Sequence, residues 1–113
     1  MIHATKPVSL PEPIDAYFTA DGVGGEAVSL CFSENAVVKD EGHTHKGRDA
    51  IRAWKTNAST KYQYTSEPFA CEEKGDIIQV TSHVAGNFPG SPIDIRYSFK
   101  LEGGKIEALE ISA

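Results

Sequence analysis

The apolar residues of this chain follow two different periods, and the change from one to the other divides the sequence into a helical and a strand-forming part. In the helical part Ile14, Tyr17 and Phe18 recur at i, i+3 and i+4 just after a pair of prolines, which predicts a short helix with one apolar face. A glycine-rich break at 22–25 ends this helix. Residues 1–11 have no periodicity and are expected to form a loose N-terminal arm or an early strand.

Two further helices are predicted before the period changes. Apolar positions over 27–32 predict a second short helix that ends at the polar residues 33–35. A polar loop is expected over 41–46. A third helix is predicted from about 47 to 57, where Ile51 and Trp54 lie three positions apart and share a face.

From residue 62 onward apolar and polar residues alternate, which is the period of a strand with one covered face. Four such segments, separated by turn signals, are predicted as strands over 62–73, 76–84, 93–101 and 105–112. Helices first and hairpin strands afterwards predict an α+β domain, in which about three N-terminal helices pack on one side of a strongly curved antiparallel sheet.

Length and composition narrow the classes of protein to which this chain can belong. A chain of 113 residues fits one domain, so residues 1–113 are expected to fold as a single unit. The net charge is −5 and the basic residues are scattered, which argues against binding of nucleic acid. No apolar run approaches the roughly 20 residues that span a bilayer, so no membrane-spanning segment is expected. The first residues lack the basic start and apolar run of a signal peptide, which favours a cytoplasmic protein.

Asp40 is the first candidate for a chemical role. It closes a predicted strand over 36–40, so its side chain points the same way as Ala36 and Val38, while Lys39 points the other way. A carboxylate held among apolar side chains has its charged form disfavoured, and this environment suits proton transfer near neutral pH. The alternative is a strand-end aspartate that caps a turn or pairs with a nearby cation.

Two consecutive segments of the chain read Phe32-Ser33-Glu34-Asn35-Ala36-Val37-Val38 and Gly47-Arg48-Asp49-Ala50-Ile51-Arg52-Ala53-Trp54. In this order they resemble the nuclear transport factor 2-like superfamily, particularly its SnoaL-like and ketosteroid-isomerase-like branch. The resemblance covers nearly the whole chain. It implies a cone of three helices wrapped by a bent sheet, open at one end to a pocket, and commonly a dimer through the outer face of the sheet. Because this superfamily hosts isomerases, cyclases, hydrolases, dehydratases and proteins without chemistry, the fold does not fix the function.

The resemblance also implies roles for three residues. In ketosteroid isomerase a catalytic aspartate lies at the end of the first strand after the helical hairpin, which is the place of Asp40. Tyr17 corresponds approximately to the tyrosine that donates a hydrogen bond to the oxyanion, and Tyr97 stands where that enzyme has a protonated aspartate. Asp40 would then act as a general base, with Tyr17 and Tyr97 as donors to an enolate. Ordinary core tyrosines show the same sequence pattern.

Aromatic and histidine residues complete the predicted site. Trp54, Phe69 and Phe88 would line an apolar pocket for a flat organic ligand, or would fill the core. His43 is expected at the rim of the pocket, either exposed to solvent or as a proton carrier. His43 and His45 lie near carboxylates but have no H-x-x-x-H helix and no cysteine partner, so no metal site is predicted. No sequence motif for a cofactor is present either.

The sequence therefore predicts a small-molecule pocket protein of the SnoaL-like type. Its activity would be that of a cofactor-independent isomerase, cyclase or lyase, with Asp40 as general base on an apolar, carbonyl-bearing ligand. The alternative is a non-catalytic ligand-binding or dimerisation module. A homodimer is expected in either case, because one face of the predicted sheet carries a wet polar set formed by Gln79, Thr81, His83, Asp94, Arg96 and Ser98.

Overall fold

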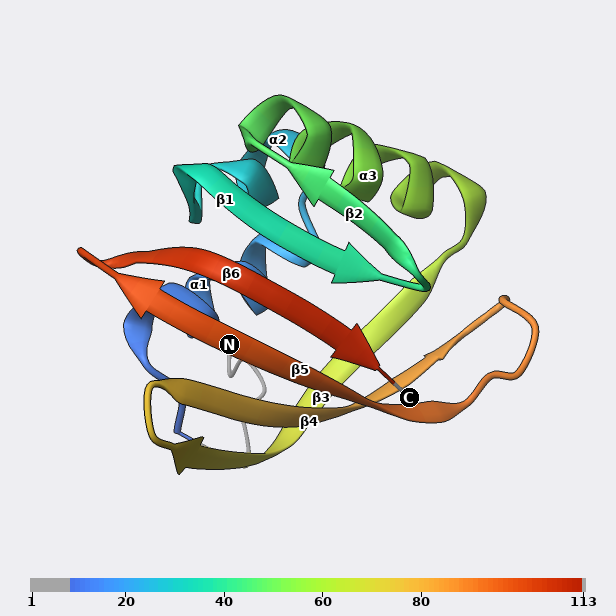
Figure 1. Ribbon diagram of the computed structural model, residues 1–113. Helices are drawn as coiled ribbons and strands as arrows, with labels where there is room; N and C mark the ends of the chain where they lie inside the picture. Colours follow the sequence, from blue (N-terminus) through green and yellow to red (C-terminus); the bar gives the residue numbers. More distant parts are fainter. Residues whose placement is uncertain (1–8, 113) are drawn as a thin grey trace, which may run out of the picture.

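The structure is a computed structural model that describes residues 9–112 (Figure 1). Most of the predicted N-terminal arm, and with it the stretch that favoured a cytoplasmic location, lies outside the described residues. The elements follow in the order α1 (Glu12–Asp21), α2 (Gly25–Ser29), β1 (Phe32–Asp40), β2 (His43–Lys46), α3 (Arg48–Lys61), β3 (Tyr64–Lys74), β4 (Ile77–Gly86), β5 (Ile93–Glu102) and β6 (Lys105–Ser112). None of the described helices is long and apolar enough to cross a membrane.

The strands form one curved sheet in the order β2-β1-β6-β5-β4-β3, and the helices cover its inner face (Figure 1). Neighbouring strands are antiparallel except for β1 and β6, which are parallel. The predicted α+β class is confirmed, but the expected purely antiparallel sheet is corrected to a mixed one. The reason is that alternation within a strand predicts which face is covered and does not predict its neighbour, which for β1 comes from the end of the chain.

Two local predictions are also corrected. The second helix ends at Ser29, and Phe32, which was expected to belong to it, begins β1 instead. A short apolar run fits either a helix or a strand, and here the strand buries Phe32 completely on the inner face. The polar loop expected at 41–46 contains β2, which pairs with the end of β1. Its polar composition is explained by its place at the edge of the sheet, where most of its side chains are exposed.

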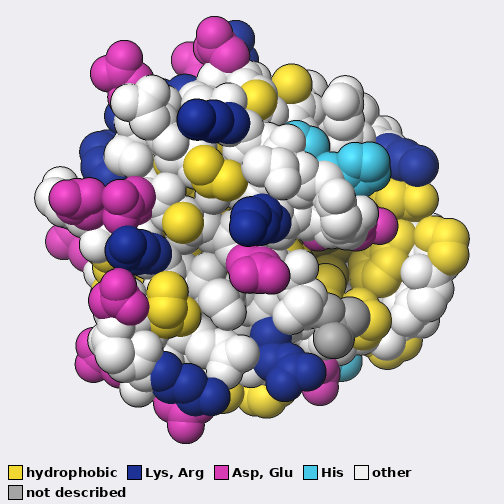
Figure 2. Space-filling model, in the orientation of Figure 1, with side chains coloured by type: hydrophobic (Ala, Val, Ile, Leu, Met, Phe, Trp, Pro, Cys, Tyr) yellow, Lys and Arg dark blue, Asp and Glu magenta, His cyan; other side chains and the backbone are white. Residues whose placement is uncertain are grey.

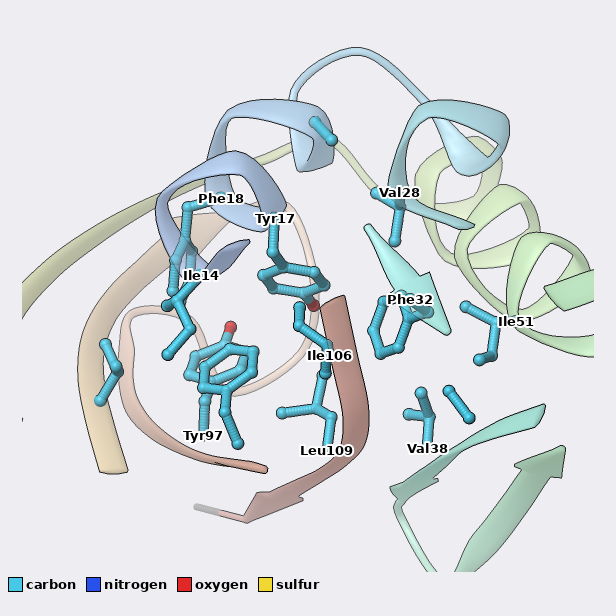
Figure 3. Close-up of a cluster of buried hydrophobic side chains, with 14 residues drawn as sticks. Ile14, Tyr17, Phe18, Val28, Phe32, Val38, Ile51, Tyr97, Ile106 and Leu109 are labelled. Carbon is cyan, nitrogen blue, oxygen red and sulfur yellow. The ribbon is translucent and has the colours of Figure 1, made fainter. Parts of the chain in front are cut away.

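The core lies between α1 and the inner face of the sheet (Figure 3). Ile14, Tyr17 and Phe18, the predicted apolar face of the first helix, are all buried. The ring of Tyr17 makes edge contacts with its neighbours, among them Phe99 at 5.6 Å and Tyr97 at 6.2 Å between ring centroids. Such edge-to-face contacts add to the burial of apolar area, so the position of Tyr17 is fixed by the core.

Helix α3 is held against β1 by contacts at its first turn. The backbone N–H of Gly47 donates to the carbonyl of Ala36 at 2.8 Å, and Arg48 Nε donates to the carbonyl of Phe32 at 2.9 Å. Gly47 has a φ of +89°, which a residue with a side chain rarely adopts. Because these bonds fix the start of α3, its second and third turns lie over the end of β1.

Candidate functional site

A cavity of about 510 Å³ lies between α1, α3 and the inner face of the sheet. Residues of two helices, of five strands and of the segments between them line the cavity: Tyr17, Asp40, Glu41, Trp54, Lys55, Ala58, Tyr62, Tyr64, Val84, Phe88, Pro89, Ile93, Ile95, Tyr97, Ile111 and Ser112. Figure 2 shows hydrophobic side chains gathered over the loop between β4 and β5, at one side of the molecule. This volume is within the range of about 300–1,000 Å³ that is common for small-molecule pockets.

Asp40 lies at the wall of this cavity. Ala36 and Val38, on the same face of β1, are completely buried, and Lys39 on the other face is exposed, as the alternation predicted. Trp54 Nε1 donates a hydrogen bond to Asp40 Oδ2 at 3.0 Å. Within the described part of the chain Asp40 belongs to no ion pair. One carboxylate oxygen is thus oriented by the indole while the group keeps the capacity to accept a proton.

Tyr17 also lines this cavity, and its hydroxyl is buried. Its side chain is 1 % exposed, and its hydroxyl has no hydrogen-bond partner among the described residues. Burial raises the pKa of Tyr17 well above its ordinary value, and the negative charge of Asp21 acts in the same direction. Tyr17 therefore keeps its proton at neutral pH, and this O–H is a hydrogen-bond donor for which residues 9–112 offer no acceptor.

Tyr97 is a second buried phenol in the cavity, but its surroundings differ. Burial raises the pKa of Tyr97, while a hydrogen bond with Ser66 acts in the opposite direction. Ser66 in turn is hydrogen-bonded to Ser82, with 2.6 Å between the two hydroxyl oxygens. Tyr97 thus has a polar partner, whereas the hydroxyl of Tyr17 has none in the part of the chain that the structure describes.

The sequence analysis missed a third polar feature, the buried cation Lys55. Its side chain is 6 % exposed, and its Nζ lies 2.9 Å from Asp21 Oδ1 and 3.3 Å from the hydroxyl of Tyr64. Tyr64 also donates to Asp21 Oδ1 at 2.9 Å. The helical period carried the signal for this group, because Lys55 is at i+4 from Ile51 and therefore on the apolar face of α3.

The remaining predicted site residues are divided between the cavity and the outer surface. Trp54 and Phe88 line the cavity, whereas Phe69 and His43 do not. Phe69 is 47 % exposed and lies at an irregularity of β3 between Pro68 and Ala70, where the alternation shifts by one residue. His43 pairs with Asp40 in the β1–β2 register, with its side chain exposed.

Two histidines contact other elements. The centroid of the His45 ring lies 5.8 Å from that of the Trp54 ring. His83 is on the outer face of the sheet, where its Nδ1 lies 2.9 Å from Asp94 Oδ1. Among the described residues no group of three histidine, cysteine or acidic side chains is arranged to hold a metal ion.

No family model and no curated protein matches the sequence, whereas many solved structures match the fold. A crystal structure from Sinorhizobium meliloti, provisionally assigned as a polyketide cyclase, is 40 % identical and superposes with a TM-score of 0.86 over 91 % of this chain and 95 % of that one.

Two more distant structures have the same fold. A protein with a ketosteroid isomerase-like fold from Catenulispora acidiphila, in complex with trimethylamine, is 19 % identical with a TM-score of 0.82, over 93 % of this chain and 87 % of that chain. A nuclear transport factor 2-like protein of unknown function from Cytophaga hutchinsonii is 14 % identical with a TM-score of 0.72, over 96 % of this chain and 93 % of that chain.

Proposed function

Because the chain belongs to the nuclear transport factor 2-like superfamily, in its SnoaL-like and ketosteroid-isomerase-like branch, we propose that it binds a small apolar ligand with a carbonyl group in its cavity and moves a proton on that ligand. The reaction class is that of an isomerase, cyclase or lyase without a cofactor. One observation carries the proposal: a carboxylate and a buried phenol line the same cavity, and within residues 9–112 the first has no cation partner and the second has no acceptor.

Each of these two groups has a role in proton abstraction next to a carbonyl. Asp40 accepts the proton from carbon, with its carboxylate held in orientation by Trp54 Nε1. The carbonyl oxygen gains negative charge as the proton leaves, and Tyr17 donates its hydrogen bond to this oxygen. The raised pKa of Tyr17 suits this role, since the phenol stays protonated at the pH where Asp40 acts.

The walls of the cavity support an apolar ligand. Aliphatic and aromatic side chains form most of its lining, including Val84, Phe88, Ile93 and Ile95. An enolate formed among such side chains is shielded from water, which strengthens its hydrogen bond to Tyr17.

The similarity to a structure provisionally assigned as a polyketide cyclase favours carbon–carbon bond formation as the outcome. In such a closure, the carbanion formed next to one carbonyl attacks the carbon of a second carbonyl of the same molecule. The π bond of that second carbonyl breaks, and the resulting alkoxide takes back the proton that Asp40 had accepted. This step needs the same base and the same donor as an isomerisation. The site thus supports both reactions, and the identity of the ligand decides between them.

A test that needs no knowledge of the natural ligand is exchange of the α-proton of β-tetralone, a flat apolar ketone, in deuterium oxide. We expect the protein to accelerate this exchange and the Asp40→Asn variant to lose the acceleration. Tyr17→Phe should slow it by about 10²–10³, the usual effect of removing one oxyanion donor. Asp76→Asn, an exposed change in the turn before β4, is the matched control and should exchange at the native rate.

Binding of a planar phenol such as β-naphthol separates an enzyme from a passive binder. Asp40→Asn keeps the shape of the site and removes a negative charge, so it should bind β-naphthol as well as the native protein or more tightly. Tyr17→Phe should bind it more weakly. A native protein that binds the phenol but never accelerates exchange would be a ligand-binding module, which is the alternative function.

The homodimer belongs to the same proposal. Thr81, Arg96 and Ser98 lie on neighbouring strands of the outer face of the sheet, away from the cavity. Their polar character suits a wet, self-complementary contact that leaves the cavity of each protomer open.

A further inference from the structure

The buried cation Lys55 has no part in the proposed proton transfer, although it lines the same cavity. Its partner Asp21, at the end of α1, is equally buried and is not part of the cavity wall. Lys55 therefore joins the cavity wall to a carboxylate that is not part of the lining. An isolated buried charge is unfavourable, so the pairing with Asp21 is what allows a cation to remain at this wall.

The ammonium group has the capacity for one more acceptor. It carries three N–H bonds, and among the described residues its oxygen partners are Asp21 and Tyr64. The carboxylate and the phenol also bond to each other, which holds both in position around Lys55. A donor that is oriented in this way on the inside of a ligand cavity can bind a ligand oxygen with little loss of side-chain entropy.

Trp54 separates this cation from the base. Its ring N–H bonds to Asp40, while its face lies 4.4 Å from Lys55 Nζ, measured to the ring centroid. The indole thus contacts the two charged groups with two different parts of its surface. This arrangement keeps Asp40 and Lys55 from forming an ion pair with each other, so each group remains available to a ligand.

We propose that Lys55 is the specificity-determining residue of the cavity and binds a second oxygen of the ligand, distinct from the carbonyl that Tyr17 contacts. This inference rests on the proposed function and deepens it by naming the ligand class. The ligand is a neutral, apolar molecule with two separated oxygen groups. One is the carbonyl next to the acidic carbon, and the other is a carbonyl or hydroxyl that accepts from Lys55.

The charges around the cavity favour a neutral ligand over an acid. Lys55 and Asp21 cancel each other, which leaves Asp40 and Glu41 as the charged groups of the lining that have no ion-pair partner among the described residues. A carboxylate on the ligand would be repelled by both of these groups, while a carbonyl or hydroxyl oxygen would meet no such penalty.

Three probes on one scaffold test the inference: β-naphthol, the same naphthol with a formyl group on its far ring, and the matching carboxylate. The formyl group also makes the phenol more acidic, and this effect on affinity is the same in every protein variant. The readout is therefore the affinity for the formyl probe divided by the affinity for β-naphthol, compared between the variants. We expect this affinity ratio to be about tenfold higher for the native protein than for the Asp21→Asn/Lys55→Met double variant. The reason is that the double variant has lost the charged donor that would bond to the formyl oxygen. The double variant removes the pair as a unit and leaves no buried charge unpaired.

Tyr64→Phe is a milder second variant, since it removes one partner of the ammonium and keeps the ring. It should lower the preference for the formyl probe even if the double variant does not fold. Lys39→Met, on the outer side of β1, is the matched control and should keep the native preference.

The other outcomes would overturn the inference in distinguishable ways. An equal preference for the formyl probe over β-naphthol in the native protein, the double variant and Tyr64→Phe would show that Lys55 does not bind the ligand. The proposed function would still stand in that case if Asp40→Asn altered the binding of β-naphthol. Tightest binding of the carboxylate probe would contradict the neutral ligand class. If none of the three probes bound, the inference and the proposed function would fail together.

Discussion

At the scale of single residues, Tyr17 and Tyr64 are both phenols at the wall of the cavity and differ in what their hydroxyls contact. Tyr64 donates to Asp21 and accepts from Lys55, whereas the hydroxyl of Tyr17 has no partner among the described residues. A protein stabilised only for its fold would have no reason to bury a donor without an acceptor. The unsatisfied hydroxyl of Tyr17 is therefore consistent with the ligand-binding role that we propose for it.

This difference predicts opposite effects of the same chemical change on stability. Tyr17→Phe removes an unsatisfied hydroxyl and should leave the free energy of unfolding unchanged or raise it by up to about 1 kcal/mol. Tyr64→Phe breaks a buried network and should lower it by about 1–3 kcal/mol. Urea unfolding of both variants measures the two effects. A large loss of stability in Tyr17→Phe would mean that its hydroxyl is structurally bonded.

The raised pKa of Tyr17 predicts how stability depends on alkaline pH. The unfolded chain releases the phenolic proton at about pH 10, whereas the folded chain holds it to a higher pH. The contribution of Tyr17 to the free energy of unfolding is therefore fully present below about pH 10. It is lost as the pH rises from there through the higher pKa of Tyr17 in the folded chain. Tyr17→Phe should show a shallower decline between about pH 9 and 11 in urea unfolding. Parallel declines in the two proteins would contradict this assignment.

At the scale of secondary structure, the cavity depends on close packing between the short helix α2 and helix α3. A Cβ placed on Gly25 would overlap Thr56 Oγ1 and lie 2.6 Å from the carbonyl oxygen of Arg52. The absence of a side chain at this position thus lets α2 approach the backbone of α3. Since α3 carries both Trp54 and Lys55, the spacing of these helices affects the site as well as the fold.

Gly25→Ala should therefore destabilise the protein by about 1–3 kcal/mol through overpacking. Gly22→Ala is the matched control, because a Cβ there would meet its nearest atom at 3.6 Å and the backbone has a φ of −82°. We expect the control to leave the midpoint of thermal unfolding nearly unchanged, and the Gly25 variant to lower it by several degrees. Equal midpoints for the two variants would show that α2 can move away from α3 without loss.

At the scale of the whole molecule, the curved sheet separates two surfaces with different roles. The inner face contacts the helices and the cavity, and the outer face is a mixture of charged, polar and a few apolar side chains (Figure 2). A second shallow hollow of about 150 Å³ on this outer face lies between Lys39, Ile77 and Lys100. The outer face is therefore the surface available for association between copies of the chain.

A homodimer through this face should have a mass of twice the 12.2 kDa chain in light scattering at micromolar concentration. Arg96→Glu reverses a charge near the centre of the polar set and should shift the equilibrium towards monomer. Lys61→Glu, at the exposed end of α3, is the control and should remain dimeric. A monomeric native protein at these concentrations would contradict the dimer.

The amino-acid sequence by itself determined which side of a regular helix or strand a residue occupies. Alternation placed Asp40 with Ala36 and Val38, and the helical period placed Tyr17 with Ile14, because the positions of neighbouring Cβ atoms follow from the backbone conformation alone. The order of periods also determined the fold class, since each amphipathic element must cover its apolar face with another element.

Only the tertiary structure decided which of these side chains meet. The hydrogen bond between Trp54 and Asp40, and the pairing of Lys55 with Asp21, join separate elements, and no local period encodes such contacts. The sequence also did not predict the irregularity in β3, where one inserted residue reverses the faces of the residues that follow. It did not predict the parallel pairing of β1 with β6 either, because long-range packing decides which strands become neighbours. The cavity arises in the same way, from the curvature of a sheet whose strands come from both halves of the chain.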